Sequence, residues 1–262
     1  TRRPGIATLP DIAPTVLAHL GITRPTSMLG RPWFADPAEP NERVAGAVDL
    51  DREAVFIDAI RTPVSTAFVL FQLLVYAAAV WVLTRRRFDG ENPERSRMGN
   101  ALHNAALYLA AFPVATYLAG VVQGHTLGWA GYSVLLIGIA AAIVVAVDLL
   151  VSDTLDRLLV VAALTFAVLV VDLAIGAPLQ LNTVFSYSPI VAGRFAGLGN
   201  IGFAVLSAAS LLTGALLVHR FGATTRTLAG VAALFALTVV IDGAPQFGSD
   251  VGGAIALVPG LG

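Results

Sequence analysis

The residues of this chain whose types and spacing could do chemistry gather around one arginine, Arg194. It lies in FSYSPIVAGRFAGLGN, residues 185–200, a polar and glycine-rich segment between two long apolar runs. A guanidinium binds phosphate or carboxylate groups through two parallel N–H donors. Three aspartates in or beside neighbouring apolar runs could pair with it, act as a base or hold a cation: Asp172, Asp242 and Asp250. The sequence therefore predicts a charged site in apolar surroundings.

The elements that must position these residues are membrane-spanning helices. The chain is 56% hydrophobic and 13% charged, whereas a soluble domain carries roughly 25% charged residues. Several of its apolar runs approach the roughly 20 residues that cross a bilayer. We expect a mainly α fold, with a polytopic helical bundle over 63–262 and a short α/β fragment at the N-terminus. The bundle is predicted to have six full spans and a truncated seventh, at about 64–84, 101–122, 130–151, 158–177, 197–218, 227–241 and from 251.

Charge predicts how these helices are oriented. The short loops that alternation places on one side hold eight arginines, and those on the other hold only Arg194. Because positive residues in short loops stay cytoplasmic, the 85–100 loop is predicted inside and residues 1–62 outside. The GHTLGW loop, the 178–196 segment and DGAPQFGSDVGG then share the outer face. With its arginine-only basic residues and its alanine, valine and leucine richness, the chain is predicted to be a multipass protein of a bacterial plasma membrane.

The candidate substrate-binding set includes three further polar residues near Arg194, namely Ser186, Tyr187 and Asn200. Glycines flank both Arg194 and Asp250, and glycine lets backbone approach a ligand or another helix closely. Irregular backbone at membrane depth must be buried in protein or line a wet cavity, so we expect broken helices or helices that begin within the outer leaflet. Two interpretations stay open: a structural Arg–Asp pair that pins two helices, and a site for a polar or anionic substrate.

Several kinds of site are absent from the sequence. It has no cysteine, which excludes disulfides, thiolate catalysis and cysteine-based metal sites. The net charge of −1 gives no argument for nucleic acid. His103 and His125 lack metal-ligand spacing with each other or with a carboxylate. We therefore expect no cofactor within this chain and no catalytic nucleophile, so enzymatic activity stays open. Four glycines are predicted to permit close helix contact, namely Gly120, Gly124, Gly128 and Gly131.

The N-terminal segment TRRPGIATLPDIAPTVLAHLGITRPTSMLGRPW predicts a strand, a turn, a helix and a loop. Asp11 suits an N-cap, Pro14 the first helical turn and Gly21 the end of the helix. Residue 1 is threonine, and the last residues begin an apolar segment that stops early, so we expect an excerpt of a longer protein. A piece of this size buries too little apolar surface to fold alone.

The order of Asp11, Pro14-Thr15, Leu17, Leu20-Gly21-Ile22 and Gly30-Arg31 resembles the C-terminal end of alkaline-phosphatase-superfamily domains. There a D-x-x-P-T-x-L-x-x-L-G-I helix and a G-R turn close the α/β domain. The resemblance covers residues 1–35 and implies that metal ligands, a divalent metal and a nucleophile belong to an upstream domain. His19 is expected to be a surface or packing residue. The remainder resembles bacterial multipass proteins that join such a domain to a membrane bundle and have no established activity.

Three functions remain. The first is a membrane module that presents or handles an extracytoplasmic anionic or lipid-linked substrate for the phosphatase-like domain. The second is a transporter or flippase, and the third is a plain multipass anchor. A transporter is expected to carry charged groups near the membrane midplane on several helices. Here the charge lies towards one face, which favours the first function over the second, whereas an anchor needs only one helix.

Overall fold

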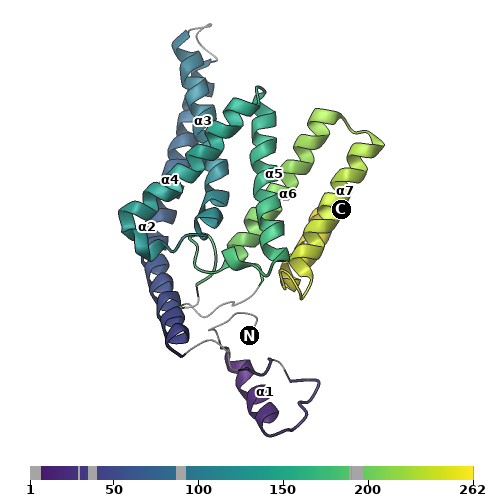
Figure 1. The fold of residues 1–262 in the computed structure, drawn as a ribbon. Helices are drawn as coiled ribbons and strands as arrows, with labels where there is room; N and C mark the ends of the chain where they lie inside the picture. Colours follow the sequence, from purple (N-terminus) through teal and green to yellow (C-terminus); the bar gives the residue numbers. More distant parts are fainter. Residues whose placement is uncertain are drawn as a thin grey trace.

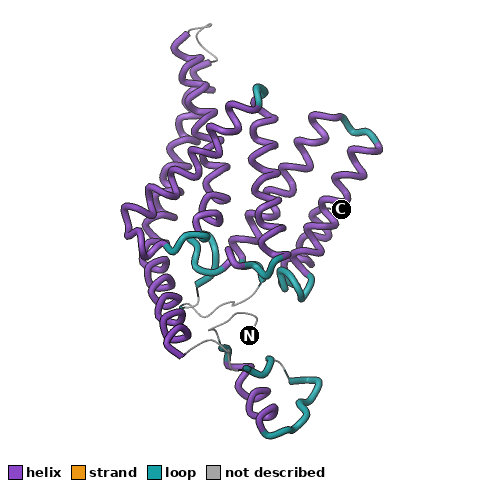
Figure 2. Tube along the Cα trace, in the orientation of Figure 1, coloured by secondary structure: helices purple, strands orange, loops and turns teal. Residues whose placement is uncertain are grey.

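The chain forms a bundle of long helices in a computed structural model, shown in Figure 1. The structure describes residues 7–28, 30–34, 40–86, 93–188, 190 and 197–261. Within these ranges it has eight α-helices, one short 3₁₀ helix and no β-strand. Figure 2 shows helices joined by loops. The predicted mainly α, polytopic fold is confirmed. The strand predicted at the N-terminus falls largely on residues 1–6, which lie outside the described residues.

The helices follow the chain in a simple order. Their bounds are α1 Leu9–His19, α2 Pro40–Arg86, α3 Pro93–Ala119, α4 Gly124–Leu150, α5 Thr154–Ala174, η1 Pro178–Gln180, α6 Asn200–Phe221, α7 Thr225–Gly243 and α8 Val251–Leu261. Five of them, α2, α4, α5, α6 and α7, are long and apolar enough to cross a membrane. The chain is therefore a multipass membrane protein by length and composition, with α8 as a shorter apolar helix.

The helix α3 contains the predicted span 101–122 as far as Ala119, but it is not among these five. It has 27 residues, which is long enough, and it packs against α2, α4 and α5. Its residues Ala111, Val114, Ala115 and Tyr117 are fully buried. Because α3 contacts protein on several sides, it needs fewer strongly apolar residues than a helix that faces lipid.

The helix α2 is longer than a bilayer requires. Its 47 residues extend roughly 70 Å at 1.5 Å per residue, against a hydrocarbon core of about 30 Å. The polar residues 40–62, predicted to form part of a domain tail and linker, are therefore a helical extension of the first span. Ile57 and Ile60 in this extension belong to the same core cluster as Tyr132 of α4. The part of the extension next to the first span is therefore packed against the bundle.

The loops alternate between the two ends of the bundle (Figure 1). Residues 120–123, 175–188 and 244–250 lie at one end, which we call the polar end, and residues 151–153 and 222–224 lie at the other. Of the three segments that were expected to share a face, the described parts of 178–196 and of DGAPQFGSDVGG lie at this end. The prediction that GHTLGW, residues 124–129, is a loop was wrong, because these residues form the start of α4, which begins at the same end. The side of the membrane that the polar end faces stays a prediction.

Two of the four spaced glycines make close contacts. A Cβ on Gly120 would clash with Cγ2 of Thr183, and one on Gly124 would lie 2.7 Å from the ring of Phe56. Gly128 differs, because its φ of 67° interrupts the helical torsions of α4 and is a conformation that suits glycine. It therefore bends the start of α4 rather than admitting a neighbouring helix.

The helix α1 differs in detail from its prediction. Thr8 is the N-cap and Asp11 is the third residue of the helix, so the prediction that Asp11 is the N-cap was wrong. The carboxylate of Asp11 accepts hydrogen bonds from the backbone N–H and hydroxyl of Thr8 and, at 2.8 Å, from the N–H of Arg31. It thereby ties the Gly30-Arg31 turn to the start of the helix. Pro14 lies inside α1 rather than in its first turn, whereas Gly21 follows the helix end with a φ of 68°, as predicted.

Candidate functional site at the polar end

Asp172 lies two residues before the end of α5 and folds the following chain back onto the bundle. Its side chain is 1% exposed. One carboxylate oxygen accepts the N–H of Leu179 at 2.7 Å, and the other accepts the side-chain amide of Gln180 at 3.1 Å. The turn between them uses Gly176 and Ala177, both with positive φ. Asp172 therefore holds η1 against the end of α5.

The segment made up of η1 and the loop that follows it is buried although it is polar. Its buried polar residues are Gln180, Asn182, Thr183, Ser186 and Ser188. The Ser186 hydroxyl donates to the carbonyl of Thr183 and accepts the Thr183 N–H, both at 2.9 Å. The Tyr117 hydroxyl of α3 donates to the carbonyl of Phe185 at 2.8 Å. Ser186, predicted as a substrate-binding residue, thus has a hydroxyl that holds the loop together.

Arg61 of α2 also reaches this loop, and the sequence reasoning did not single it out. Its guanidinium donates to the carbonyl of Thr183 at 3.3 Å. Its Nε is buried and has no hydrogen-bond partner in the part of the chain that the structure describes. The available signal was an arginine immediately before the first apolar run, but it was assigned to the polar N-terminal domain.

A second group of carboxylates surrounds the start of α8. Asp242 is 0% exposed and Asp250 is 7% exposed. Asp250 accepts the N–H of Gly253 at 3.2 Å, and its own N–H donates to the carbonyl of Asp242 at 2.9 Å. A Cβ on Gly253 would lie 2.6 Å from a carboxylate oxygen of Asp242. Glycine at this position therefore lets the first turn of α8 pack directly on Asp242.

The first turn of α6 lies between the two groups. A Cβ on Gly202 would lie 2.8 Å from Oε1 of Gln180, on the Asp172 side. The ring of the next residue, Phe203, would lie 2.7 Å from a Cβ on Gly253, on the Asp242 side. The N–H of Leu198, just before α6, donates to the carbonyl of Gly248 at 2.8 Å. The start of α6 is therefore packed against both the Asp172 turn and the α7–α8 connection.

Arg194 lies in 191–196, outside the described residues, so its pairing with an aspartate stays a prediction. The described chain resumes at Gly197, three residues before α6 begins at Asn200. Asn200 is exposed, and the ring of Tyr187 packs beside Gly199. The helices α6 and α8 begin in these glycine-rich segments, and the expectation that they begin within the outer leaflet stays a prediction.

The side-chain amide of Gln180 has a defined orientation. Its NH₂ group donates to Asp172, and a reversed amide would place its oxygen against that carboxylate. Its Oε1 therefore faces Gly202, and it is a buried acceptor with no partner among the described residues. A buried acceptor without a donor costs free energy, so this position suits a hydrogen-bond donor.

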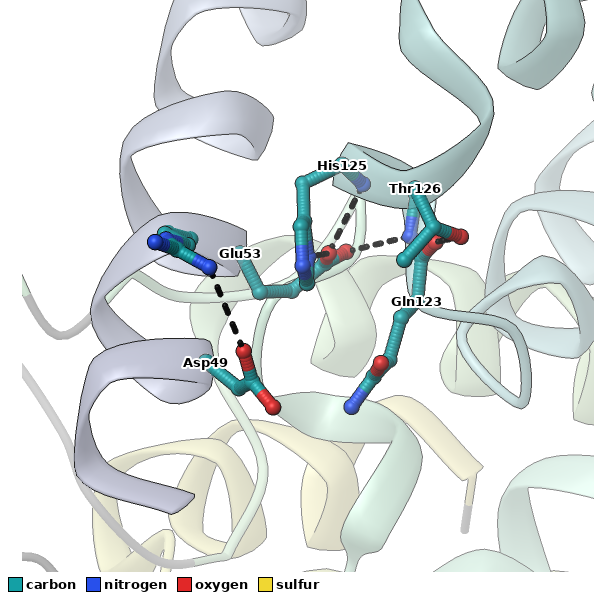
Figure 3. Close-up of polar contacts among 7 residues, drawn as sticks. Asp49, Glu53, Gln123, His125 and Thr126 are labelled. Carbon is teal, nitrogen blue, oxygen red and sulfur yellow. Dashed lines mark hydrogen bonds and ion pairs between the residues drawn. The ribbon is translucent and has the colours of Figure 1, made fainter. Parts of the chain in front are cut away.

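A separate polar contact joins α2 to the start of α4 (Figure 3). The carboxylate of Glu53 accepts the backbone N–H groups of Gly124 and His125, each at 3.0 Å. It also lies 2.8 Å from Nδ1 of His125. A carboxylate at a helix N-terminus satisfies N–H groups that have no partner within the helix. This contact is structural, and His125 takes part in no metal cluster within the described ranges.

Neither metal ligation nor similarity to a known protein adds to the description of the site. Across the described residues, no group of three or more histidine, aspartate and glutamate side chains could hold a metal ion. His19 is exposed, and its Nδ1 lies 2.9 Å from the carbonyl of Thr15. No protein-family model, curated protein or solved structure matches the chain.

Proposed function

We propose that this chain is the membrane module of a bacterial cell-envelope protein, and that its polar end handles an anionic or lipid-linked substrate on the extracytoplasmic side. The observation that carries the proposal is the burial of Asp172, Asp242 and Asp250 on the two sides of the first turn of α6. Ionisable groups at membrane depth cost roughly 2.5–3.5 kcal/mol each on insertion scales and usually mark functional sites.

Two arginines supply the positive charge that an anionic substrate needs. Arg61 already contacts the buried loop through the carbonyl of Thr183. Arg194 belongs to the segment that leads into α6, and in the proposal its planar guanidinium binds the anionic group through two donors. An aspartate of either group then orients the guanidinium or acts as a base.

The exposed apolar residues of α1 are an argument for a neighbouring phosphatase-like domain. Its residues Leu9, Ile12 and Val16 are exposed apolar side chains at helical spacing, as expected of a helix that packs against further structure. Together with the sequence resemblance, this favours substrate handling beside such a domain.

The distribution of polar groups favours this function over transport. In the described middle of the bundle, the buried polar side chains carry hydroxyls rather than charges. Examples are Thr165, which donates to the carbonyl of Val161, and Ser210, which is hydrogen-bonded to Thr238. A transporter places its substrate and ion sites near the membrane midplane, whereas the buried carboxylates here lie at one end.

The proposal is tested by binding of a polyprenyl phosphate to the chain in nanodiscs, measured by native mass spectrometry. We expect Arg194→Ala and Asp242→Asn to reduce binding at least tenfold, with Arg194→Lys rescuing poorly. Arg52→Ala, an exposed position on α2, is the matched control and is expected to bind like the original chain. Equal binding by all variants, or none by the original chain, would overturn the proposal and leave a plain anchor as the better description.

A further inference from the structure

The membrane-spanning part of α2 leaves most of its surface uncovered by the bundle. Between residues 64 and 84, Val75 and Val82 are the only buried residues. Because they are seven residues apart, they lie on the same side of the helix. The other sides face lipid or another chain. A helix surface that faces only lipid is expected to be apolar, because hydrocarbon tails offer no hydrogen bond.

Gln72 is a polar residue on this uncovered surface. Its side-chain amide donates to the hydroxyl of Tyr76 at 2.6 Å, and Tyr76 is 55% exposed. Within the described residues this is the one hydrogen bond of the Gln72 side chain, so a second N–H and the carbonyl oxygen remain. Gln72 lies roughly 12 Å past residue 64 at 1.5 Å per residue, within a hydrocarbon core about 30 Å thick. The amide therefore needs a donor and an acceptor from another chain.

The residues around Gln72 follow the spacing of a two-helix interface. The set Val69, Gln72, Tyr76, Ala79 and Leu83 is spaced by three, four, three and four residues, which is the spacing of the a and d positions of a heptad. Val69 is 50% exposed and Leu83 is 62% exposed, and Gln72 and Ala79 are partly exposed. We call these five residues the α2 stripe. It does not include the two buried valines, so the bundle leaves it open.

We propose that the α2 stripe is the interface of a parallel dimer, in which α2 of a second copy of this chain packs along it. Copies of one membrane protein cross the bilayer in the same direction, so each stripe residue meets its own counterpart across a two-fold axis. The two Gln72 amides then face each other, and each offers an N–H to the oxygen of the other. Ale helix that is apolar at this level would leave the amide unpaired, whereas a second α2 satisfies it. The inference does not depend on the proposed function.

The first test is disulfide crosslinking of the full chain in membranes. The chain has no cysteine, so a single introduced cysteine reports only on its own neighbours. A disulfide requires Cα atoms within about 7 Å of each other, which in the proposed dimer holds along the stripe and not on the opposite side of α2. Val69→Cys and Leu83→Cys are therefore expected to give linked dimers on oxidation. Leu74→Cys, at an equally exposed leucine outside the stripe, is the matched control and is expected to give none.

The second test measures the dimer fraction of the fluorescently labelled chain in liposomes by single-molecule photobleaching. Gln72→Leu removes the amide and is expected to weaken dimerisation about fivefold, Gln72→Asn keeps an amide and is expected to weaken it less, and Leu74→Ala is expected to have no effect. Four results would overturn the inference: a monomeric original chain, an unchanged dimer in Gln72→Leu, equal crosslinking at Leu83→Cys and Leu74→Cys, or linkage of Val69→Cys to a different protein.

Discussion

The carboxylate of Glu53 lies 2.8 Å from Nδ1 of His125 and accepts the backbone N–H of the same residue. The Glu53 side chain of α2 thereby caps the N-terminus of α4, at the point where the polar extension of α2 contacts the bundle. The contact joins residues 72 positions apart in the sequence, so it contributes to tertiary structure rather than to either helix alone.

The first prediction concerns this contact. Glu53→Gln keeps the shape of the side chain but removes the charge that faces the N-terminus of α4. We expect the free energy of unfolding to fall by about 1–2 kcal/mol, because hydrogen bonds to charged groups and charge at a helix end each contribute on this scale. Thermal unfolding in detergent measures it. Glu42→Gln, on the exposed first turn of α2, is the control, and an equal effect of both variants would contradict a specific role for Glu53.

The second prediction compares two glycines. A Cβ on Gly202 would meet Leu198 at 2.7 Å and Gln180 at 2.8 Å, whereas one on Gly230 of α7 meets nothing within 4 Å. Gly202→Ala is expected to destabilise the chain by about 1–3 kcal/mol through overpacking. Gly230→Ala is expected to stabilise it by roughly 0.5–1 kcal/mol, because alanine loses less backbone entropy in a helix. Unfolding midpoints measure both, and a stabilising Gly202→Ala would show that the polar end is loosely packed.

The third prediction concerns acid. Burial raises the pKa of Asp11, but hydrogen bonds from the Thr8 hydroxyl, the Arg31 N–H and the Thr8 N–H lower it more, so the pKa lies well below its usual value. The stabilisation is therefore complete above the unfolded pKa of about 3.9 and is lost as the pH falls below it towards the folded pKa.

Trp33 fluorescence reports this change, because the backbone N–H of Trp33 donates to the Thr15 hydroxyl, close to the contact between Asp11 and Arg31. With Trp81 and Trp129 replaced by phenylalanine, the signal is expected to change on acidification below about pH 4. Asp11→Asn should remove that pH dependence. A transition of the same size in Asp11→Asn would assign it to another group.

The membrane class and most spans were predictable from the sequence because a bilayer selects long apolar runs. The helical continuation of the first span through residues 40–62 was not predictable, since the hydropathy of these residues matches that of any exposed polar segment. The weaker apolar signal of α3 has a different cause, because the helix includes polar residues such as Thr116 and Tyr117 that are buried against protein rather than exposed to lipid.

The candidate site was predictable in its residue types but not in its contacts. Asp172, Asp242 and Asp250 stood out because charge is costly among apolar helices. The role of Gln180 could not be anticipated, because it depends on a chain reversal after α5 that only the folded structure defines. Arg61 was overlooked because it precedes the apolar run by a few residues.

The continuous helix α2 has a mechanical consequence. Residues 40–53 extend roughly 20 Å at 1.5 Å per residue beyond the point where Glu53 meets α4, and they are continuous with the part of α2 that carries Arg61, ahead of Pro63 inside the helix. A tilt or rotation of the N-terminal end of α2 is transmitted along the helix past Glu53, where α2 contacts α4. Arg61 lies about two turns further along α2 and contacts the Thr183 carbonyl. A motion of the helix therefore reaches the loop that holds the buried polar groups.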